Sequence, residues 1–277
     1  RLTQWNSSKT FTVSGAGGGY SSTTVNANTT NRYDWNVSIP VALSSPTIEA
    51  VILDDLILCR NGTLPGIGNW LPYTYFALSL KPETQGQLLW MKNYDAPPGN
   101  VTLLNRPFSA AEGVWVMLYK ETLQWVAYDM HTGNLLWGPT DPEPEMQYYS
   151  AATSGKRVTS IADGVFYSTG YSGKVFAYNL TTGNLLWEFE TDSGVNTVYG
   201  GYPLHIGAIC DGKVYIGTHE HSASTPLYKG ARLYCLNTTN GQPIWDLMGW
   251  GASFSFAVAD GYLVYDNLYD QQVYCIG

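Results

Sequence analysis

Residues 175–188 contain two short apolar runs that flank one polar turn. Residues 175–178 alternate in the manner of a half-buried strand, residues 179–184 are polar and include a glycine, and residues 185–187 start a second apolar run. Alternation on both sides of a glycine-containing polar segment is typical of a β-hairpin. The pattern therefore predicts a hairpin over Val175–Glu188.

The same hairpin pattern recurs along the chain. Trp125–Trp137 and Leu233–Trp245 repeat it, and Tyr75–Trp90 is a looser copy, at a period near 50 residues. A pattern that recurs at a fixed period of this size indicates a repeat architecture.

A second signal precedes each hairpin, namely a short acidic turn between two apolar runs. It occurs at Asp54-Asp55, Glu112-Gly113, Asp163-Gly164, Asp211-Gly212 and Asp260-Gly261. Asp-Gly between strand-like runs is a strong hairpin signal, so one repeat contains four strands, here called a, b, c and d in chain order. Four antiparallel strands in about 50 residues are typical of a propeller blade. We therefore predict an all-β fold, a β-propeller of four-stranded antiparallel blades.

The predicted blades fill a single domain over residues 1–277. About five are visible, at residues 46–95, 101–138, 150–190, 203–249 and 252–277. Residues 1–41 resemble strands c and d only, separated by an insertion at 9–32 whose Gly/Ser/Thr/Asn-rich composition predicts flexibility. The last blade shows strands a, b and c but no d. Either the N-terminal segment lends strand d to the last blade and closes a five-bladed ring, or the chain is part of a seven- or eight-bladed ring; the surplus c strand favours the second.

Composition narrows the class of protein. Charged residues make up 13% of the chain and aromatic residues 14%, and the net charge is −8. A nucleic-acid-binding domain needs a basic surface, so this class is not expected. No apolar run approaches the roughly 18 residues that a membrane-spanning helix requires. Residues 1–5 do not resemble a signal peptide, which can already have been removed.

Asparagine sequons point to an extracellular, cell-surface location. Seven Asn-x-Ser/Thr triplets without an intervening proline exceed what the composition predicts by chance, and such acceptors mark the surface loops of secreted proteins. The predicted glycosylation sites are Asn6, Asn28, Asn36, Asn61, Asn100, Asn179 and Asn237. The alternative is that an Asn- and Thr-rich turn, used repeatedly, creates sequons by itself, as at Asn179 and Asn237.

The four cysteines show no metal-binding or redox spacing. Cys59, Cys210, Cys235 and Cys275 are dispersed, without a CxxC motif. Cys235 and Cys275 hold the same place in neighbouring repeats, too far apart for the short Cα separation of a disulfide. We expect four buried thiols, with one bridge as the alternative.

The c-turn-d repeat resembles that of pyrroloquinoline-quinone-type (quinoprotein-like) β-propeller proteins, which has the form Ala-x-Asp-x-x-Thr-Gly-x-x-x-Trp. Residues 127–137 fit it throughout, and residues 177–187 fit with Asn in place of Asp. Residues 217–234 and 260–277 look like uncharacterised archaeal cell-surface members of this class. The resemblance implies that the repeat tryptophans pack between adjacent blades, which assigns a structural role to Trp90, Trp137, Trp187 and Trp245.

The resemblance suggests quinoprotein dehydrogenase activity as a function, but we do not expect this activity. Those enzymes use a quinone, a Ca²⁺ ion, a catalytic Asp and often two adjacent cysteines. The chain has no adjacent cysteines, no acidic ligand set that can be assigned to a blade, and no CxxCH motif for covalent haem. We therefore predict no catalytic residues and no cofactor.

Two polar clusters are candidate metal sites. His219 and His221 lie two residues apart, so on an extended strand they project to the same side, and with His205 they would suit Zn²⁺ or another transition metal. The alternative is that these histidines only form hydrogen bonds. Residues 141–145, Asp-Pro-Glu-Pro-Glu, offer carboxylates for Ca²⁺, but they more simply make a stiff acidic loop.

The long loops indicate where a partner binds. In an up-and-down blade the b–c and d–a loops share one face, and here they are long and rich in aromatic residues, whereas the a–b and c–d turns are tight. Function concentrates on such loops, and exposed Tyr and Trp suit a protein or sugar partner. The predicted binding face comprises Trp70, Tyr73, Tyr148, Tyr149, Tyr199, Tyr202, Tyr228 and Trp250. The alternative is that these rings only pack the loops onto the blades.

These patterns favour a non-enzymatic, extracellular β-propeller that acts as a binding or assembly module of the cell surface. The partners would be other surface proteins or glycans, with self-assembly or completion by another chain as further alternatives, and without nucleic acid or a membrane span. A structural subunit of a surface layer or filament is one alternative function. A polysaccharide-active or metal-dependent hydrolase is another.

Overall fold

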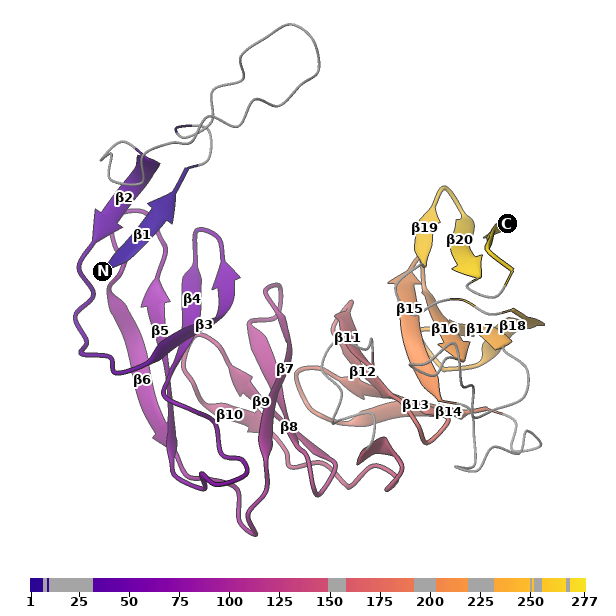
Figure 1. The fold of residues 1–277 in the computed structure, drawn as a ribbon, viewed down its shortest axis with the longest axis horizontal. Helices are drawn as coiled ribbons and strands as arrows, with labels where there is room; N and C mark the ends of the chain where they lie inside the picture. The colour runs from indigo at the N-terminus through magenta and orange to yellow at the C-terminus, as the bar shows by residue number, and fades with distance from the viewer. Residues whose placement is uncertain are drawn as a thin grey trace, which may run out of the picture. The chain divides into compact units, whose positions relative to one another are not determined.

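The structure is a computed structural model that describes residues 1–6, 9, 32–148, 158–191, 203–218, 232–249, 251, 256–267 and 270–277. Antiparallel β-sheets make up its regular structure, most of them four-stranded, so the prediction of an all-β, propeller-like fold is confirmed (Figure 1). Most of the predicted insertion at 9–32 lies outside the described residues. No helix in the described part of the chain is long and apolar enough to cross a membrane.

In the described part of the chain the strands form six sheets, and the members of each sheet follow one another in the sequence. They are β1 (Leu2–Trp5) and β2 (Tyr33–Val37); β3 (Pro46–Ile52), β4 (Leu56–Asn61), β5 (Tyr73–Ser79) and β6 (Leu88–Tyr94); β7 (Leu103–Ser109), β8 (Val114–Tyr119), β9 (Gln124–Asp129) and β10 (Leu135–Trp137); β11 (Thr159–Ala162), β12 (Val165–Thr169), β13 (Lys174–Asn179) and β14 (Leu185–Glu190); β15 (Leu204–Cys210), β16 (Lys213–Thr218), β17 (Arg232–Asn237) and β18 (Pro243–Met248); and β19 (Ala257–Ala259), β20 (Tyr262–Asn267) and β21 (Gln272–Ile276).

The chain forms two compact units. Unit 1 comprises Arg1–Gly62 and Tyr73–Tyr94, and unit 2 comprises Thr63–Pro72 and Asp95–Gly277. The prediction of one domain with the stated blade limits stays a prediction.

In unit 1, the sheet β3–β6 supplies a small apolar core. Its buried members include Ile57, Phe76 and Leu78, and Leu2 of β1 and Trp35 of β2 pack against them. Arg60 and Glu49 form an ion pair whose side chains are both largely buried, with Nε and Oε1 2.7 Å apart.

In unit 2, each sheet packs against the sheet that follows it in the sequence. One core joins β7–β10 to β11–β14, a second joins β11–β14 to β15–β18, and a third joins β15–β18 to β19–β21. The c strands β13 and β17 are buried along most of their length because the sheets of two successive cores cover their two faces and strand d covers their edge. This stacking of successive sheets is the packing that the repeat predicts.

Every c–d hairpin contains a bulge just before its tryptophan. In β13–β14, Trp187 is opposite Ala177 and Leu185 is opposite Tyr178, so Leu186 is an extra residue. The same shift precedes Trp90, Trp137 and Trp245, and in β1–β2 it precedes Trp35. The first two strands therefore have the hairpin geometry of the later repeats. Period-two reasoning from sequence does not show this bulge, which changes the face on which the tryptophan lies.

The cysteines are free thiols, and one departs from the prediction. Cys59 and Cys235 are buried and Cys210 is half-buried, but Cys275 is exposed, so the expectation of four buried thiols is wrong. Cys275 lies on β21, whose outer edge is not paired with any of the described strands. The equivalent Cys235 is covered by β18.

Candidate functional site

Trp137 and Trp187 lie between adjacent sheets. Trp137 Nε1 donates to the carbonyl oxygen of Leu180 at 2.7 Å, and Trp187 Nε1 donates to that of Thr238 at 2.8 Å. Each indole therefore joins the c–d turn of the following sheet through the only hydrogen-bond donor of its ring. These contacts have the form that the family resemblance implies. Trp245 and Trp90 are half-buried, and Trp245 lies 6.0 Å from Tyr215 between ring centroids.

Close approach of each indole requires a glycine in the neighbouring turn. Gly183 has a φ of +73°, and a Cβ added to it would lie 2.6 Å from the Trp137 ring. Gly241 contacts the Trp187 ring in the same way. The glycine of the repeat is therefore explained by packing as well as by turn conformation.

Asparagine and aspartate play one role in these turns. Asp129 Oδ1 accepts hydrogen bonds from the backbone N–H groups of residues 131 and 132, at 2.8 and 2.7 Å. Asn179 Oδ1 accepts from residues 181 and 182 at 3.1 and 2.9 Å, and Asn237 Oδ1 accepts from residue 239 at 2.8 Å. Asp129 closes its turn in the same way as Asn179 and Asn237 close theirs. This role in the turn explains why asparagine occurs at positions 179 and 237, without glycosylation.

The other predicted sequons have different surroundings. Asn36 and Asn100 are exposed, whereas Asn61 is half-buried and its Oδ1 accepts from the backbone N–H groups of Ser44 and Ser45, both at 3.1 Å. Asn6 Nδ2 donates to the Asp34 carboxylate. Asn28 lies outside the described residues.

The predicted histidine site is described at one position only. His205 is buried on β15, with its ring edge-to-face against Phe256 at 5.4 Å between centroids. His219 and His221 lie outside the described residues, so this metal site stays a prediction. Within the described ranges, no group of three or more His, Cys, Asp or Glu side chains could hold a metal ion.

The acidic loop at 141–145 contains a buried carboxylate that sequence reasoning missed. Asp141 and Glu145 are exposed, but Glu143 is buried between the sheets β7–β10 and β11–β14. Its Oε1 accepts from Trp125 Nε1 at 2.7 Å and from the Tyr178 hydroxyl at 3.1 Å. Its Oε2 accepts from Ser168 Oγ at 2.9 Å and from Gln147 Nε2 at 3.4 Å.

Burial dominates the electrostatics of Glu143. Loss of water raises the pKa of this carboxyl to about 7, although the four hydrogen bonds act in the opposite direction. Burial, together with the Glu143 charge, raises the pKa of Tyr178. Glu143 and Arg106 line a small cavity of about 10 Å³, and burial lowers the pKa of the Arg106 guanidinium group. Glu143 therefore links the sheets β7–β10 and β11–β14 through hydrogen bonds with side chains of both.

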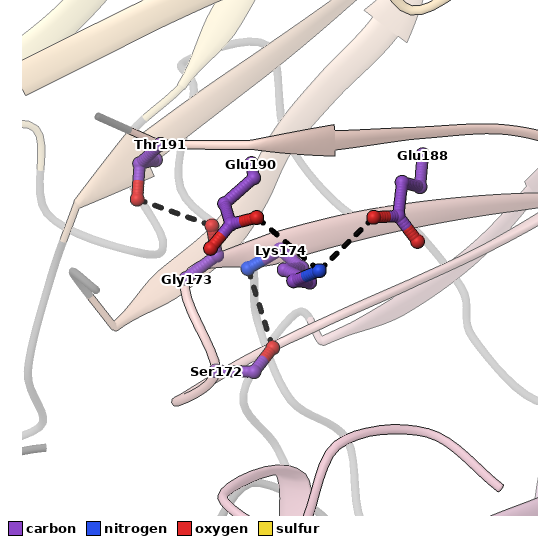
Figure 2. A network of polar contacts seen from close by, with 6 residues as sticks. All are labelled: Ser172, Gly173, Lys174, Glu188, Glu190 and Thr191. Carbon is purple, nitrogen blue, oxygen red and sulfur yellow. Dashed lines mark hydrogen bonds and ion pairs between the residues drawn. The ribbon is translucent and has the colours of Figure 1, made fainter. Parts of the chain in front are cut away.

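An exposed ion-pair network lies across β13 and β14 (Figure 2). Lys174 Nζ is 3.0 Å from Glu188 Oε1 and 3.2 Å from Glu190 Oε2. Its hydrogen bond with Glu188 raises the pKa of Lys174 most strongly. At the start of the same hairpin, Thr191 Oγ1 donates to the Gly173 carbonyl oxygen at 3.1 Å. The network supports the pairing of the two strands, and exposed pairs of this kind contribute little to stability.

The predicted binding face is described at three of its eight positions. Tyr73 is buried and stacks on Tyr94, with ring centroids 5.3 Å apart, so its ring is not available to a partner. This correction follows from the position of Tyr73 as the first residue of β5 rather than in the loop before it. Tyr148 is exposed beside Lys120, and Trp70 is half-buried. Tyr149, Tyr199, Tyr202, Tyr228 and Trp250 lie outside the described residues.

The loop that carries Trp70 presents an apolar protrusion, here called the knob and defined as Thr63–Pro72. At its tip Gly66 and Asn69 exchange two backbone hydrogen bonds of 2.8 Å, and Gly68 adopts a φ of +82°. These bonds close a tight turn that presents Ile67, which is 95% exposed. Leu71, 67% exposed, lies two residues beyond the turn.

The base of the knob is tied to unit 2. Pro65 is buried, and its carbonyl oxygen accepts a hydrogen bond of 2.9 Å from the N–H of Leu103. Asn69 Nδ2 donates to Thr63 Oγ1 at 2.6 Å. The knob is therefore preorganised, and ordering it costs little when a partner binds.

Unit 1 contains a concave apolar site, here called the unit 1 pocket. It has a volume of about 420 Å³ and is lined mostly by apolar side chains of β1–β4. Its exposed apolar members are Trp5, Ile48, Val51 and Leu53, and Asp54 is the one charged residue in the described part of its lining. Its volume lies in the roughly 300–1,000 Å³ range of pockets that bind small molecules.

Successive four-stranded sheets, an Asx turn in three of the c–d hairpins and a tryptophan wedge between sheets define a β-propeller repeat protein of the pyrroloquinoline-quinone type. A family model described as "Outer membrane protein assembly factor BamB" matches residues 78–277. The chain belongs to this family. No curated protein sequence matches the chain.

Several solved structures are similar in fold. BamB from Moraxella catarrhalis is 15% identical with a TM-score of 0.45, and the match covers 84% of this chain and 66% of that one. The computationally designed Ika8 protein is 15% identical with a TM-score of 0.44, over 89% and 74% of the two chains. A europium-containing methanol dehydrogenase is 14% identical with a TM-score of 0.48, over 84% and 49%. The chain thus spans about two thirds of the BamB chain and half of the dehydrogenase.

Proposed function

We propose that this protein is a non-enzymatic, extracellular β-propeller that serves as a binding and assembly module of a cell surface. The observation that carries the proposal is the knob, whose tip presents Ile67 with 95% of its surface exposed. Membership of a family described by the name of an assembly factor supports the same class of function.

A preorganised apolar protrusion is suited to binding another protein. Large exposed apolar groups on a rigid support mark interaction sites, and an anchor side chain that fills a partner's pocket supplies much of the binding energy. Ile67 is held by a hydrogen-bonded turn, so it can enter such a pocket without losing much conformational freedom.

The extracellular location and glycosylation remain part of the proposal. Asn36 and Asn100 are exposed sequon residues, and neither is needed to close a c–d turn. Mass spectrometry of the protein purified from its source should find glycan on at least one of them. Unmodified peptides covering both residues would count against a glycosylated surface protein.

Photocrosslinking on intact cells tests the binding function. A photoreactive amino acid is placed at Ile67, and a matched control carries it at Leu136, another exposed apolar residue of unit 2. The labelled protein is added to whole source cells, irradiated and then treated with an external protease. We expect one protease-sensitive adduct that forms from position 67 and not from position 136.

The same experiment can refute the proposal. Absence of any adduct from position 67, or equal adducts from positions 67 and 136, would remove the knob as the binding element. An adduct that resists the external protease would contradict the surface location.

A further inference from the structure

Two apolar surface features of this chain, one convex and one concave, are not explained by the packing of the sheets. The knob is an apolar protrusion with Ile67 at its tip, and the unit 1 pocket is an apolar hollow of about 420 Å³. Exposed apolar surface of either kind is costly in water unless a partner covers it.

The two features match in size and in chemistry. The pocket is large enough to take the side chains of Ile67 and Leu71, since pockets of its volume hold small molecules of greater size. Its walls include Trp5, Ile48 and Val51, which offer aromatic and branched surfaces to an aliphatic side chain.

Charge allows this contact between like-charged copies. The chain carries a net charge of −8, which makes copies repel each other over most of their surface. Residues 61–80, which include the knob, contain no charged residue, and among the described residues that line the pocket Asp54 is the one charged residue. The residues of the knob itself therefore bring no charge to the pocket.

We propose that copies of this chain associate with the knob of one copy seated in the unit 1 pocket of the next. The contact joins two different surfaces, so it is heterologous, and it produces an open chain of copies or a closed ring. This inference rests on the proposed assembly function and names its partner as a second copy.

Knob and pocket variants can be matched to a control. Ile67→Ser removes the tip of the knob, and Leu53→Lys places a charge at the pocket, where Leu53 is 71% exposed. Met248→Ser is the control, because Met248 is 65% exposed and belongs to neither surface. All three side chains are mostly in water, so the variants should fold.

Sedimentation velocity over a concentration series measures the association. The wild type and Met248→Ser should form species larger than a dimer as concentration rises. Ile67→Ser should weaken association about 10- to 100-fold, which is the effect expected for one buried aliphatic side chain. Leu53→Lys should weaken it at least as much.

Mixing the two defective variants gives the decisive result. The Ile67→Ser copy keeps its pocket and the Leu53→Lys copy keeps its knob, so one intact contact remains and the mixture should form a 1:1 dimer that grows no further. A wild type that stays monomeric at every concentration would overturn the inference, as would association that is insensitive to Ile67→Ser or a mixture that stays monomeric. Flotation of a monomeric wild type with phosphatidylcholine vesicles would assign the knob to a lipid surface instead.

The failure of this inference is distinguishable from failure of the proposed function. A monomeric chain that still yields an adduct from position 67 on cells binds a different surface protein.

Discussion

Replacing Glu143 with glutamine should remove a pH dependence from the stability of this protein. Glu143 is buried between two sheets, and loss of water raises the pKa of its carboxyl from 4.5 to about 7. The folded protein therefore binds this proton more tightly than the unfolded chain does. By linkage, this group makes the free energy of unfolding fall as the pH rises from about 4.5 to about 7, and its effect is constant above that window.

The size of the effect follows from the same two values. The interval from 4.5 to about 7, at about 1.4 kcal/mol per pH unit, corresponds to about 3 kcal/mol of stability present at low pH and lost at high pH. Glutamine carries no charge at any pH, and its amide oxygen can still accept from the Trp125 indole. That oxygen can also keep the Tyr178 hydrogen bond, since Trp125 and Tyr178 both donate to Oε1. The NH₂ group then takes the place of Oε2, where it can donate to Ser168 Oγ, while the Gln147 amide must turn to present its oxygen.

Urea unfolding, followed by tryptophan fluorescence at pH 5 and pH 8, measures this difference. We expect Glu143→Gln to be more stable relative to the wild type at pH 8 than at pH 5, by about 2–3 kcal/mol. Glu145→Gln on the same loop is the matched control, since Glu145 is exposed and forms no such buried site. Equal pH dependence in the wild type and in Glu143→Gln would refute the reasoning. Glu143→Ala should be destabilised at both pH values, because it leaves buried donors without an acceptor.

Two further predictions concern the c–d turns, and both are measured by urea unfolding. Gly183 and Gly164 share a φ of +73°, but a Cβ on Gly183 would lie 2.6 Å from the Trp137 ring, whereas a Cβ on Gly164 would have its nearest neighbour at 3.8 Å. Gly183→Ala should therefore lower the free energy of unfolding by about 2–4 kcal/mol and Gly164→Ala by about 1 kcal/mol, and equal losses would contradict the wedge. Asn179→Asp should change stability by less than about 0.5 kcal/mol, since Asp129 closes the equivalent turn, while Asn179→Ala should cost about 1 kcal/mol. A greater loss with aspartate than with alanine would show that the turn depends on the amide.

Local pattern was enough to predict the blade. Period-two alternation, Asp-Gly turns and the Thr-Gly–Trp repeat are short-range signals, and each one restricts the backbone where it occurs. Residues 174–190 show this, since the predicted hairpin is the observed pair β13–β14 with a turn closed by Asn179. The repeat itself indicated that several such units stack.

The apolar protrusion was predicted only in part. Trp70 marked its loop as a binding element, but Ile67 was missed because an isoleucine between two glycines carries no sequence signal of exposure. Its presentation depends on two backbone hydrogen bonds between Gly66 and Asn69. Tyr73, three residues after Trp70, has the same aromatic character and yet is buried.

Other features were decided by contacts between residues far apart in the sequence. The bulge before each tryptophan depends on the pairing register of two strands, and burial of Glu143 depends on donors up to 35 residues away. Within residues 141–145, Glu143 and Glu145 both follow a proline, so the local sequence does not show that Glu143 is buried and Glu145 exposed. The sequence by itself thus determined the strands, the turns and the repeat, because these follow from local backbone preference. The tertiary structure decided which side chains are buried, paired or exposed, because burial is a property of the packed sheets and not of the segment that carries the residue.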